Sequence, residues 1–256
     1  MQKKSSIIIV KIIVTLTFLV MVIVNALANI LPINGQNTGQ VSDSYPNLFA
    51  PAGITFVIWG VIYLLLALYC FYQIFYYENK EKLVKVGIIF SISCVANSVW
   101  IFSWHYNIIP LSMCLTLVML VCLILITRTM KNETFIVRVP FSVYFGWLTV
   151  ATIANATVLL VYWDWNRFGI SAEVWTIIII IVGMLIGGIT MLKYKDIAYG
   201  LVLIWAYIGI LIKHLSVNGF DGLYFPVIVT VSVCIFLFIV CEIIIASSLL
   251  KLRKKS

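Results

Sequence analysis

Residues 6–31 read SIIIVKIIVTLTFLVMVIVNALANIL, an apolar run in which Lys11 is the only charged side chain. A helix needs about 20 consecutive apolar residues to cross the roughly 30 Å hydrocarbon core of a bilayer. The hydrophobic part of a secretory signal peptide is shorter, about 7–15 residues. The run therefore predicts a retained membrane-spanning helix near the start of the chain rather than a cleaved signal.

The composition of the whole chain extends this prediction beyond one helix. Of 256 residues, 63% are hydrophobic and only 10% are charged, whereas soluble domains carry roughly 45–50% apolar and about 25% charged residues. A soluble protein of this length could not bury so much apolar surface in one core. The six cysteines lie in apolar runs without a C-x-x-C pair, which indicates apolar packing rather than disulfides or a metal site. These observations exclude a soluble enzyme, a disordered chain and a disulfide scaffold.

Seven further runs resemble the first in length and apolar character. The predicted fold class is therefore all-α, a polytopic membrane helical bundle of about eight transmembrane helices. The seventh run is the weakest, because only residues 197–212 are free of charge and Lys213 would have to extend to the membrane interface. The eight predicted spans cover residues 7–31, 52–77, 83–104, 108–127, 139–161, 172–192, 197–215 and 223–250.

Basic side chains predict the orientation of the bundle, because Lys and Arg collect in cytoplasmic segments. With the N-terminus inside, 15 of the 17 Lys and Arg residues fall in inner segments, and only Arg167 and Lys213 fall outside. A miscounted span would disturb this alternation, so the asymmetry supports eight spans with N-in/C-in topology. The net charge of +8 is therefore attributed to orientation in a plasma membrane of bacterial type, and no nucleic-acid partner is expected.

The outer loop after the first span, residues 32–51, is longer than most other connections and contains Gly, Asn and Pro but no Lys or Arg. Long loops of this kind are often lids over a site or flexible surface segments. The second half of this loop carries apolar and aromatic side chains that can bury against the helices, which favours a lid. The predicted lid residues are Tyr45, Pro46, Phe49 and Pro51.

Three apolar spans each carry an asparagine beside small residues at one depth: Asn25, Asn97 and Asn155. At the outer ends of these spans, Asn25 lies seven residues before Pro32, Asn97 seven before Trp104 and Asn155 seven before Tyr162. Seven residues correspond to roughly 10 Å of helical rise. Trp59 occupies the same depth in the second span, and Tyr63 follows one turn deeper on the same face. One interpretation is a polar and aromatic layer around a small-molecule cavity. The other is that the asparagines only join closely packed helices.

The other tryptophans divide by depth. Trp104, Trp163, Trp165 and Trp175 are expected at the outer interface, where belts of tryptophan commonly occur. Trp147 lies nearer the middle of its span and is a candidate for the core or for a cavity.

The stretch YPNLFAPAGITFVIWGVIYLLLA, residues 45–67, resembles the loop and second helix of the translocator protein family (TspO, the tryptophan-rich sensory proteins). That family has a proline-rich segment followed by a W-x-x-x-Y pair. Pro51, Trp59 and Tyr63 match these features here.

Two later stretches resemble the same family in the same order. NSVWIFSW is similar to its third-helix N-x-x-W-S pattern through Asn97 and Trp100. WLTVATIAN is similar to its fifth-helix pattern of Trp, Ala and Asn through Trp147, Ala151 and Asn155. The sequence departs from the family at Ala52, where a second proline is usual, and at Ile101, where the pattern has serine. The last three spans have no counterpart in the five-helix core of that family.

The resemblance implies two parts: residues 1–162 as a TspO-like five-helix bundle with the outer loop 32–51, and residues 163–256 as three additional helices with a basic tail. It also implies a flat hydrophobic ligand, with a tetrapyrrole as one candidate, and no other cofactor. The ligand-binding residues that it suggests are Trp59, Tyr63, Asn97, Trp100, Trp147 and Asn155. Asn25 joins them by depth alone.

Groups for catalysis or metal binding are sparse. The two histidines, His105 and His214, are expected to be interface residues, and no metal site is predicted because such a site usually needs three or four ligands. Glu242 is the one acidic residue inside a predicted span. Intramembrane ionisable groups are candidates for function, so Glu242 is a coupling candidate. Lys11 is a candidate partner for its carboxylate.

The leading functional hypothesis is a non-enzymatic membrane protein that binds a flat hydrophobic small molecule for sensing or transport. One alternative is a small-molecule permease coupled through Glu242, and another is a structural membrane subunit. The expected partners are the lipid bilayer and the hydrophobic ligand, and a homodimer is left open.

Overall fold

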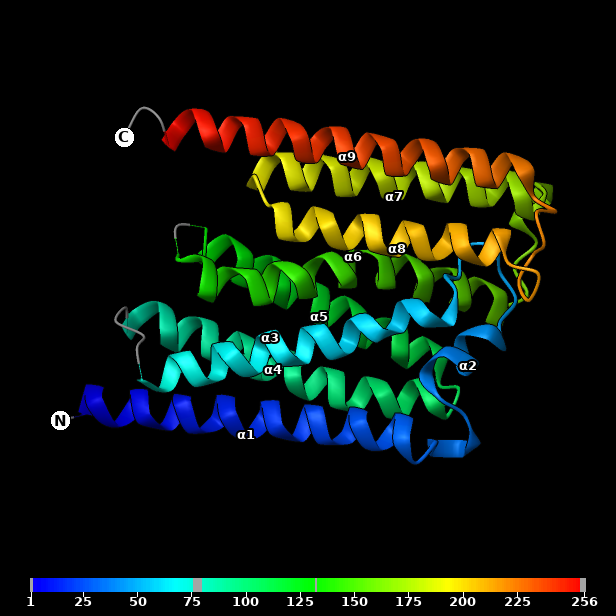
Figure 1. Cartoon of the computed structure of the whole chain (residues 1–256). Coiled ribbons are helices and arrows are strands. Elements are labelled where there is room, and N and C mark those ends of the chain that lie inside the picture. Colours follow the sequence, from blue (N-terminus) through cyan, green and yellow to red (C-terminus); the bar gives the residue numbers. More distant parts are fainter. Residues whose placement is uncertain (1, 76–79, 132, 254–256) are drawn as a thin grey trace.

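The computed structural model describes residues 2–75, 80–131 and 133–253, and these form a bundle of long helices without strands (Figure 1). A short helix and three 3-10 turns lie in the connections: η1 (Ile33–Gly35), α2 (Thr38–Asp43), η2 (Gly53–Val57) and η3 (Arg167–Gly169). The long helices are α1 (Gln2–Ile30), α3 (Ile58–Phe75), α4 (Lys80–His105), α5 (Ile109–Thr129), α6 (Phe135–Tyr162), α7 (Ala172–Tyr194), α8 (Ile197–Leu215) and α9 (Phe225–Arg253).

The predicted number of spans is confirmed, because eight helices of the described chain are long and apolar enough to cross a membrane. The second span differs from the prediction in its first turn, which is the 3-10 turn η2 rather than α-helix. Two contacts with α8 hold this segment: the Ala52 N–H donates to the Gly209 carbonyl at 3.0 Å, and the Trp205 indole N–H donates to the Thr55 carbonyl at 3.0 Å. Both bonds are made by backbone groups of the residues that precede α3, and both attach these residues to α8.

Helix α6 occupies the centre of the bundle. It packs against α3, α5 and α8, while α4 joins α5 to α1, and α9 joins α8 to α7. Every side chain from Pro140 to Val150 is buried, as expected for a helix covered on all sides. Helices α1 and α9 lie at opposite edges of the bundle (Figure 1). Only 22% of the apolar window of each is buried, which leaves their outer faces for lipid.

A glycine permits the close approach of α6 and α8. A Cβ atom at Gly146 would lie 2.8 Å from the Tyr199 carbonyl oxygen and 2.9 Å from Val202 Cβ. Small residues at helix contacts are typical of membrane bundles, because the backbones gain packing where side chains are absent. The contact joins the first five long helices to the last three.

The two ends of the chain lie at one end of the bundle, and residues 32–51 lie at the other (Figure 1). We name these the terminal end and the loop end. An even number of spans requires this arrangement, and the basic asymmetry of the sequence predicts that the terminal end is cytoplasmic.

We expect single cysteines at Val217 and Lys251, in a variant without the six native cysteines, to react with an impermeant thiol reagent from opposite sides. Val217 is 80% exposed at the loop end, and Lys251 is exposed at the terminal end. In intact cells only the Val217→Cys variant should be labelled, and lysis should allow labelling of both. Labelling of both variants in intact cells would refute the eight-span topology.

Candidate ligand-binding site

Trp59 lies at the centre of a group of aromatic rings from three helices. Its ring stacks on Tyr63 with centroids 5.6 Å apart, and it contacts Trp100 at 5.9 Å, Tyr144 at 5.8 Å and Trp147 at 6.1 Å. Helix α3 supplies the first pair, α4 supplies Trp100, and α6 supplies the last two. Aromatic pairs in this distance range stabilise a packed site beyond the area they bury. We call these five residues the aromatic cluster.

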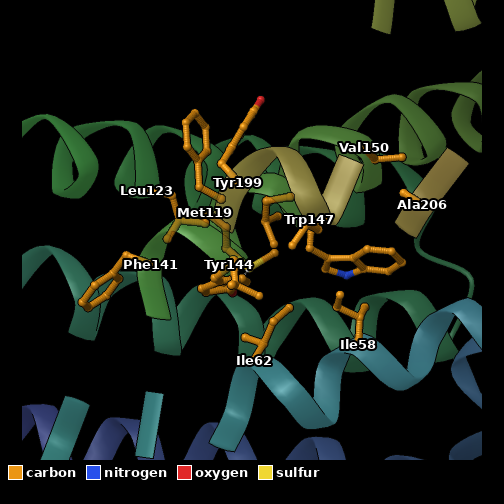
Figure 2. Packing of buried hydrophobic residues seen from close by; sticks show 14 of the residues in the cluster. Ile58, Ile62, Met119, Leu123, Phe141, Tyr144, Trp147, Val150, Tyr199 and Ala206 are labelled. Carbon is orange, nitrogen blue, oxygen red and sulfur yellow. Dashed lines mark hydrogen bonds between the residues drawn. The ribbon is translucent and has the colours of Figure 1, made fainter. Parts of the chain in front are cut away.

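The position of α6 explains how the cluster forms. Tyr144 and Trp147 are three residues apart and therefore share a helix face, and Figure 2 shows both beside Ile58 and Ile62 of α3. Ile62 is fully buried and Ile58 nearly so. The isoleucines thus fix α3 against α6 and set the height at which Trp59 meets the rings of α6.

A cavity of about 40 Å³ opens beside this cluster on the side of the loop end. Its aromatic wall consists of Phe56, Trp59, Trp100, Trp104 and Trp147. Loop residues, among them Thr38, Ser42, Asn47 and Pro51, close it, and small residues of α6 complete it. The cavity is therefore bounded by flat apolar surfaces and covered by the outer loop.

Two indole donors in the cavity wall are buried without an acceptor. The Nε1 atoms of Trp100 and Trp147 have no hydrogen-bond partner among the described residues. In contrast, Trp104 Nε1 donates to the Thr38 carbonyl of the loop at 3.1 Å. Buried donors are nearly always paired in folded proteins, so two unpaired indole donors in one cavity wall are unusual.

Asn155 is the one asparagine of the predicted layer that lines the cavity. Its Oδ1 accepts from the Ser112 hydroxyl of α5 at 2.8 Å, and its amide nitrogen donates to the Ala151 carbonyl at 3.2 Å. The side chain therefore joins α5 to α6 while one of its faces borders the cavity.

The other two asparagines bind each other. Asn25 Nδ2 donates to Asn97 Oδ1 at 2.7 Å, and Asn97 Nδ2 donates to the Tyr144 hydroxyl at 3.1 Å. All three side chains are buried, and none borders the cavity. The bonds connect α1, α4 and α6. At Asn25 and Asn97 the geometry therefore matches the interpretation in which asparagines join helices, with Tyr144 linking this network to the aromatic cluster.

The outer loop is held in place by its own turn. Asn47 Oδ1 accepts from the N–H groups of Phe49 at 3.1 Å and Ala50 at 2.9 Å, and Phe49 is only 1% exposed. The Tyr45 hydroxyl donates to Asn107 at 3.1 Å. Burial, and then the neighbouring Tyr162, raise the pKa of Tyr45 above its ordinary value.

Of the four predicted lid residues, the structure brings only one to the cavity beside the cluster. Pro51 lines that cavity. Pro46 and Phe49 line a neighbouring cavity toward α7, and Tyr45 lies farther out, against Asn107 and Tyr162.

Both histidines lie under the loop, which the sequence did not reveal. His105 Nε2 lies 3.3 Å from Thr38 Oγ1 and its Nδ1 lies 3.1 Å from the Ile33 carbonyl. His214 Nε2 lies 2.9 Å from the Leu48 carbonyl. Both rings are fully buried, so the expectation of ordinary interface residues is wrong. Each ring instead connects the loop to the end of a helix.

The interface expectation is also wrong for Trp104, which is 3% exposed and forms part of the cavity wall. Its ring stacks on Trp100 with centroids 5.9 Å apart. The spacing of four residues between them was a usable signal, because such residues share a helix face. Lys213, which was expected to extend to the membrane interface, forms an ion pair with Asp43 of the outer loop at 2.9 Å.

Glu242 and Lys11 lie far apart and do not pair. Lys11 Nζ donates to the Ile74 carbonyl of α3 at 2.9 Å, whereas Glu242 belongs to α9 at the opposite edge of the bundle (Figure 1). Lys11 is therefore not the partner of the Glu242 carboxylate. Neither residue contributes to the cavity beside the aromatic cluster.

The eight apolar helices define a multi-pass integral membrane protein with an aromatic cavity under an outer loop. A family model described as TSPO-like protein matches residues 11–245. The chain belongs to this TspO-like family. The match extends beyond Tyr162 through α7 and α8 and into α9, so the last three helices are part of it. Searches among curated proteins and among solved structures find no match.

Proposed function

We propose that the protein binds a flat, hydrophobic small molecule that carries a hydrogen-bond acceptor, in the cavity beside the aromatic cluster. The observation that supports this most strongly is the pair of buried, unpaired indole donors, Trp100 and Trp147, in one aromatic wall. Ligand sites commonly combine apolar and aromatic walls with a few placed polar groups. A ligand carbonyl or ring nitrogen would pair a donor that otherwise costs free energy.

The size of the cavity bears on the ligand and on the loop. Sites for drug-sized ligands measure roughly 300–1,000 Å³, whereas this cavity measures about 40 Å³. Binding therefore requires the loop and the neighbouring rings to move outward and then to close over the ligand. A tetrapyrrole, the ligand class that the family resemblance suggests, needs a larger opening than a compound of two or three fused rings.

The proposed role is binding for sensing or transport, without catalysis, in a plasma membrane of bacterial type. The cavity lies at the loop end of the bundle, so the proposed ligand enters under the loop from that side.

The test uses two probes that differ only in an acceptor. Fluorenone and fluorene have the same flat ring system, but only fluorenone carries a carbonyl oxygen. We expect both to quench the tryptophan fluorescence of the protein in lipid nanodiscs. Fluorenone should bind about tenfold more tightly, because pairing a buried donor is worth about 1–1.5 kcal/mol. A porphyrin serves as the larger probe. Absence of saturable quenching by all three compounds would refute the proposed function.

A further inference from the structure

Glu242 carries a buried carboxyl group in a place that the ligand site does not use. It lies in α9, within the span Phe225–Lys251. Both carboxyl oxygens are buried, and in the part of the chain that the structure describes neither has a hydrogen-bond partner. A buried polar group without a partner is rare and calls for an explanation.

The carboxyl group occupies a niche between α7, α8 and α9. A Cβ atom at Gly200 of α8 would overlap Glu242 Oε1 and also the methyl group of Met191 of α7. The absence of a side chain at Gly200 therefore creates the space that the carboxyl group fills. Residues of three helices, α7, α8 and α9, therefore form the niche.

A charged residue at the start of α8 pairs with one on α6. Asp196 lies one helical turn before Gly200 and is 5% exposed. Its Oδ2 accepts from Arg138 at 3.0 Å and from the Ser142 hydroxyl at 2.6 Å. The guanidinium of Arg138 therefore pairs with Asp196, and the ion pairs of the described residues do not include Glu242.

The titratable groups described on α7, α8 and α9 form no ion pair with Glu242 either. At the end of α7, Lys195 Nζ donates to the Ser248 hydroxyl at 3.1 Å. On α8, the Tyr199 hydroxyl donates to Thr149 at 3.0 Å. On α9 itself, the adjacent Cys241 is a free thiol. Among the described side chains, none forms an ion pair with the Glu242 carboxylate.

We propose that Glu242 is a reversible proton-binding site at the interface of α7, α8 and α9. The carboxylate takes up one proton from water at the terminal end of the bundle and becomes a neutral carboxylic acid, and it returns the proton to that water. The neutral form fits the niche without a counter-ion, whereas the ionised form must draw in water or displace its neighbours. Proton binding at Glu242 is therefore coupled to the packing of α9 on α8.

Infrared difference spectroscopy of the whole protein in lipid vesicles tests this proposal without any ligand. We expect a C=O stretching band of a protonated carboxyl group that shifts in D2O and disappears reversibly as the pH rises. The Glu242→Gln variant should lack this band and retain the fold. The control variant Glu81→Gln changes an exposed glutamate in the first turn of α4 and should retain the band.

A second variant addresses the niche. Gly200→Ala places a methyl group where the carboxyl lies, so the band should change its frequency while the Glu81→Gln spectrum stays as in the wild type. Two results would overturn the proposal: a spectrum without any band that depends on Glu242, or a Glu242 band that stays constant at every pH at which the protein is folded. The second result would identify a permanently neutral packing group. Because no ligand is added, either result is independent of the proposed ligand site.

Discussion

Replacement of Trp59 by leucine should weaken fluorenone binding by about one to two orders of magnitude in Kd. Trp59 is the one residue that contacts all four other rings of the aromatic cluster, and it borders the cavity. An aromatic contact is worth about 0.5–1.5 kcal/mol beyond its buried area, and the lost area adds to this. A loss of about 1.4 kcal/mol corresponds to a factor of ten. Quenching titrations of both proteins provide the measurement.

The matched control for this variant is Trp163→Leu. Trp163 is 60% exposed at the loop end and lies outside the cavity wall. Its replacement should leave the fluorenone affinity as in the wild type. Equal affinities for the wild type and Trp59→Leu would show that the cluster is a packing feature and that the ligand site lies elsewhere.

The Arg138→Met variant should lose about 3–5 kcal/mol of stability, because it leaves a buried carboxylate without its cation. Arg138 binds Asp196 at 3.0 Å and also donates to the Tyr194 carbonyl at 2.8 Å. Asp196 is 5% exposed and accepts from the Tyr199 N–H, which caps the start of α8. Denaturation of the protein in detergent micelles, followed by circular dichroism, measures the loss.

A double variant separates the lost ion pair from lost packing. Asp196→Asn combined with Arg138→Met removes the unpaired charge, so part of the stability should return. If the single variant unfolds with the same midpoint as the wild type, Asp196 does not depend on Arg138, and the description of this ion pair as a structural contact fails.

The helices could be predicted because the signal for each is local. An apolar run must pair its own backbone groups inside a bilayer, and a helix does so within one segment. Each of the eight runs, for example residues 6–31, therefore indicates a span on its own. Basic side chains at the ends of the spans predict which end of each span faces the cytoplasm.

The contacts of the asparagines could not be predicted in the same way. Counting residues places Asn25, Asn97 and Asn155 at one depth, but depth does not determine the direction in which each side chain points. That direction depends on how each helix is rotated against its neighbours. The rotation of α1 and α4 directs Asn25 and Asn97 toward each other, and that of α6 leaves Asn155 at the cavity.

The contacts that hold the loop in place are the part of the structure that the sequence predicts least. The positions of the loop residues are fixed by partners distant in the sequence, such as His214 for Leu48 and Lys213 for Asp43. No pattern among neighbouring residues predicts such contacts. The predicted division near residue 162 places α8 in a separate part of the chain. In the structure, α8 holds the residue that follows the loop, because the Gly209 carbonyl accepts from the Ala52 N–H. The last three helices thus help to position the segment that covers the cavity.

In the proposed function the cavity bordered by Asn155 binds the ligand, while the Asn25–Asn97 pair only joins helices. Fluorenone affinity, measured beside the free energy of unfolding for Asn155→Leu and Asn97→Leu, tests this most directly. For Asn155→Leu we expect a loss of about 1–3 kcal/mol of affinity, because the polar side chain that borders the ligand cavity is removed. For Asn97→Leu we expect a stability loss of roughly 0.6–1.7 kcal/mol and unchanged affinity. Loss of stability in both variants with unchanged affinity in both would contradict this proposal.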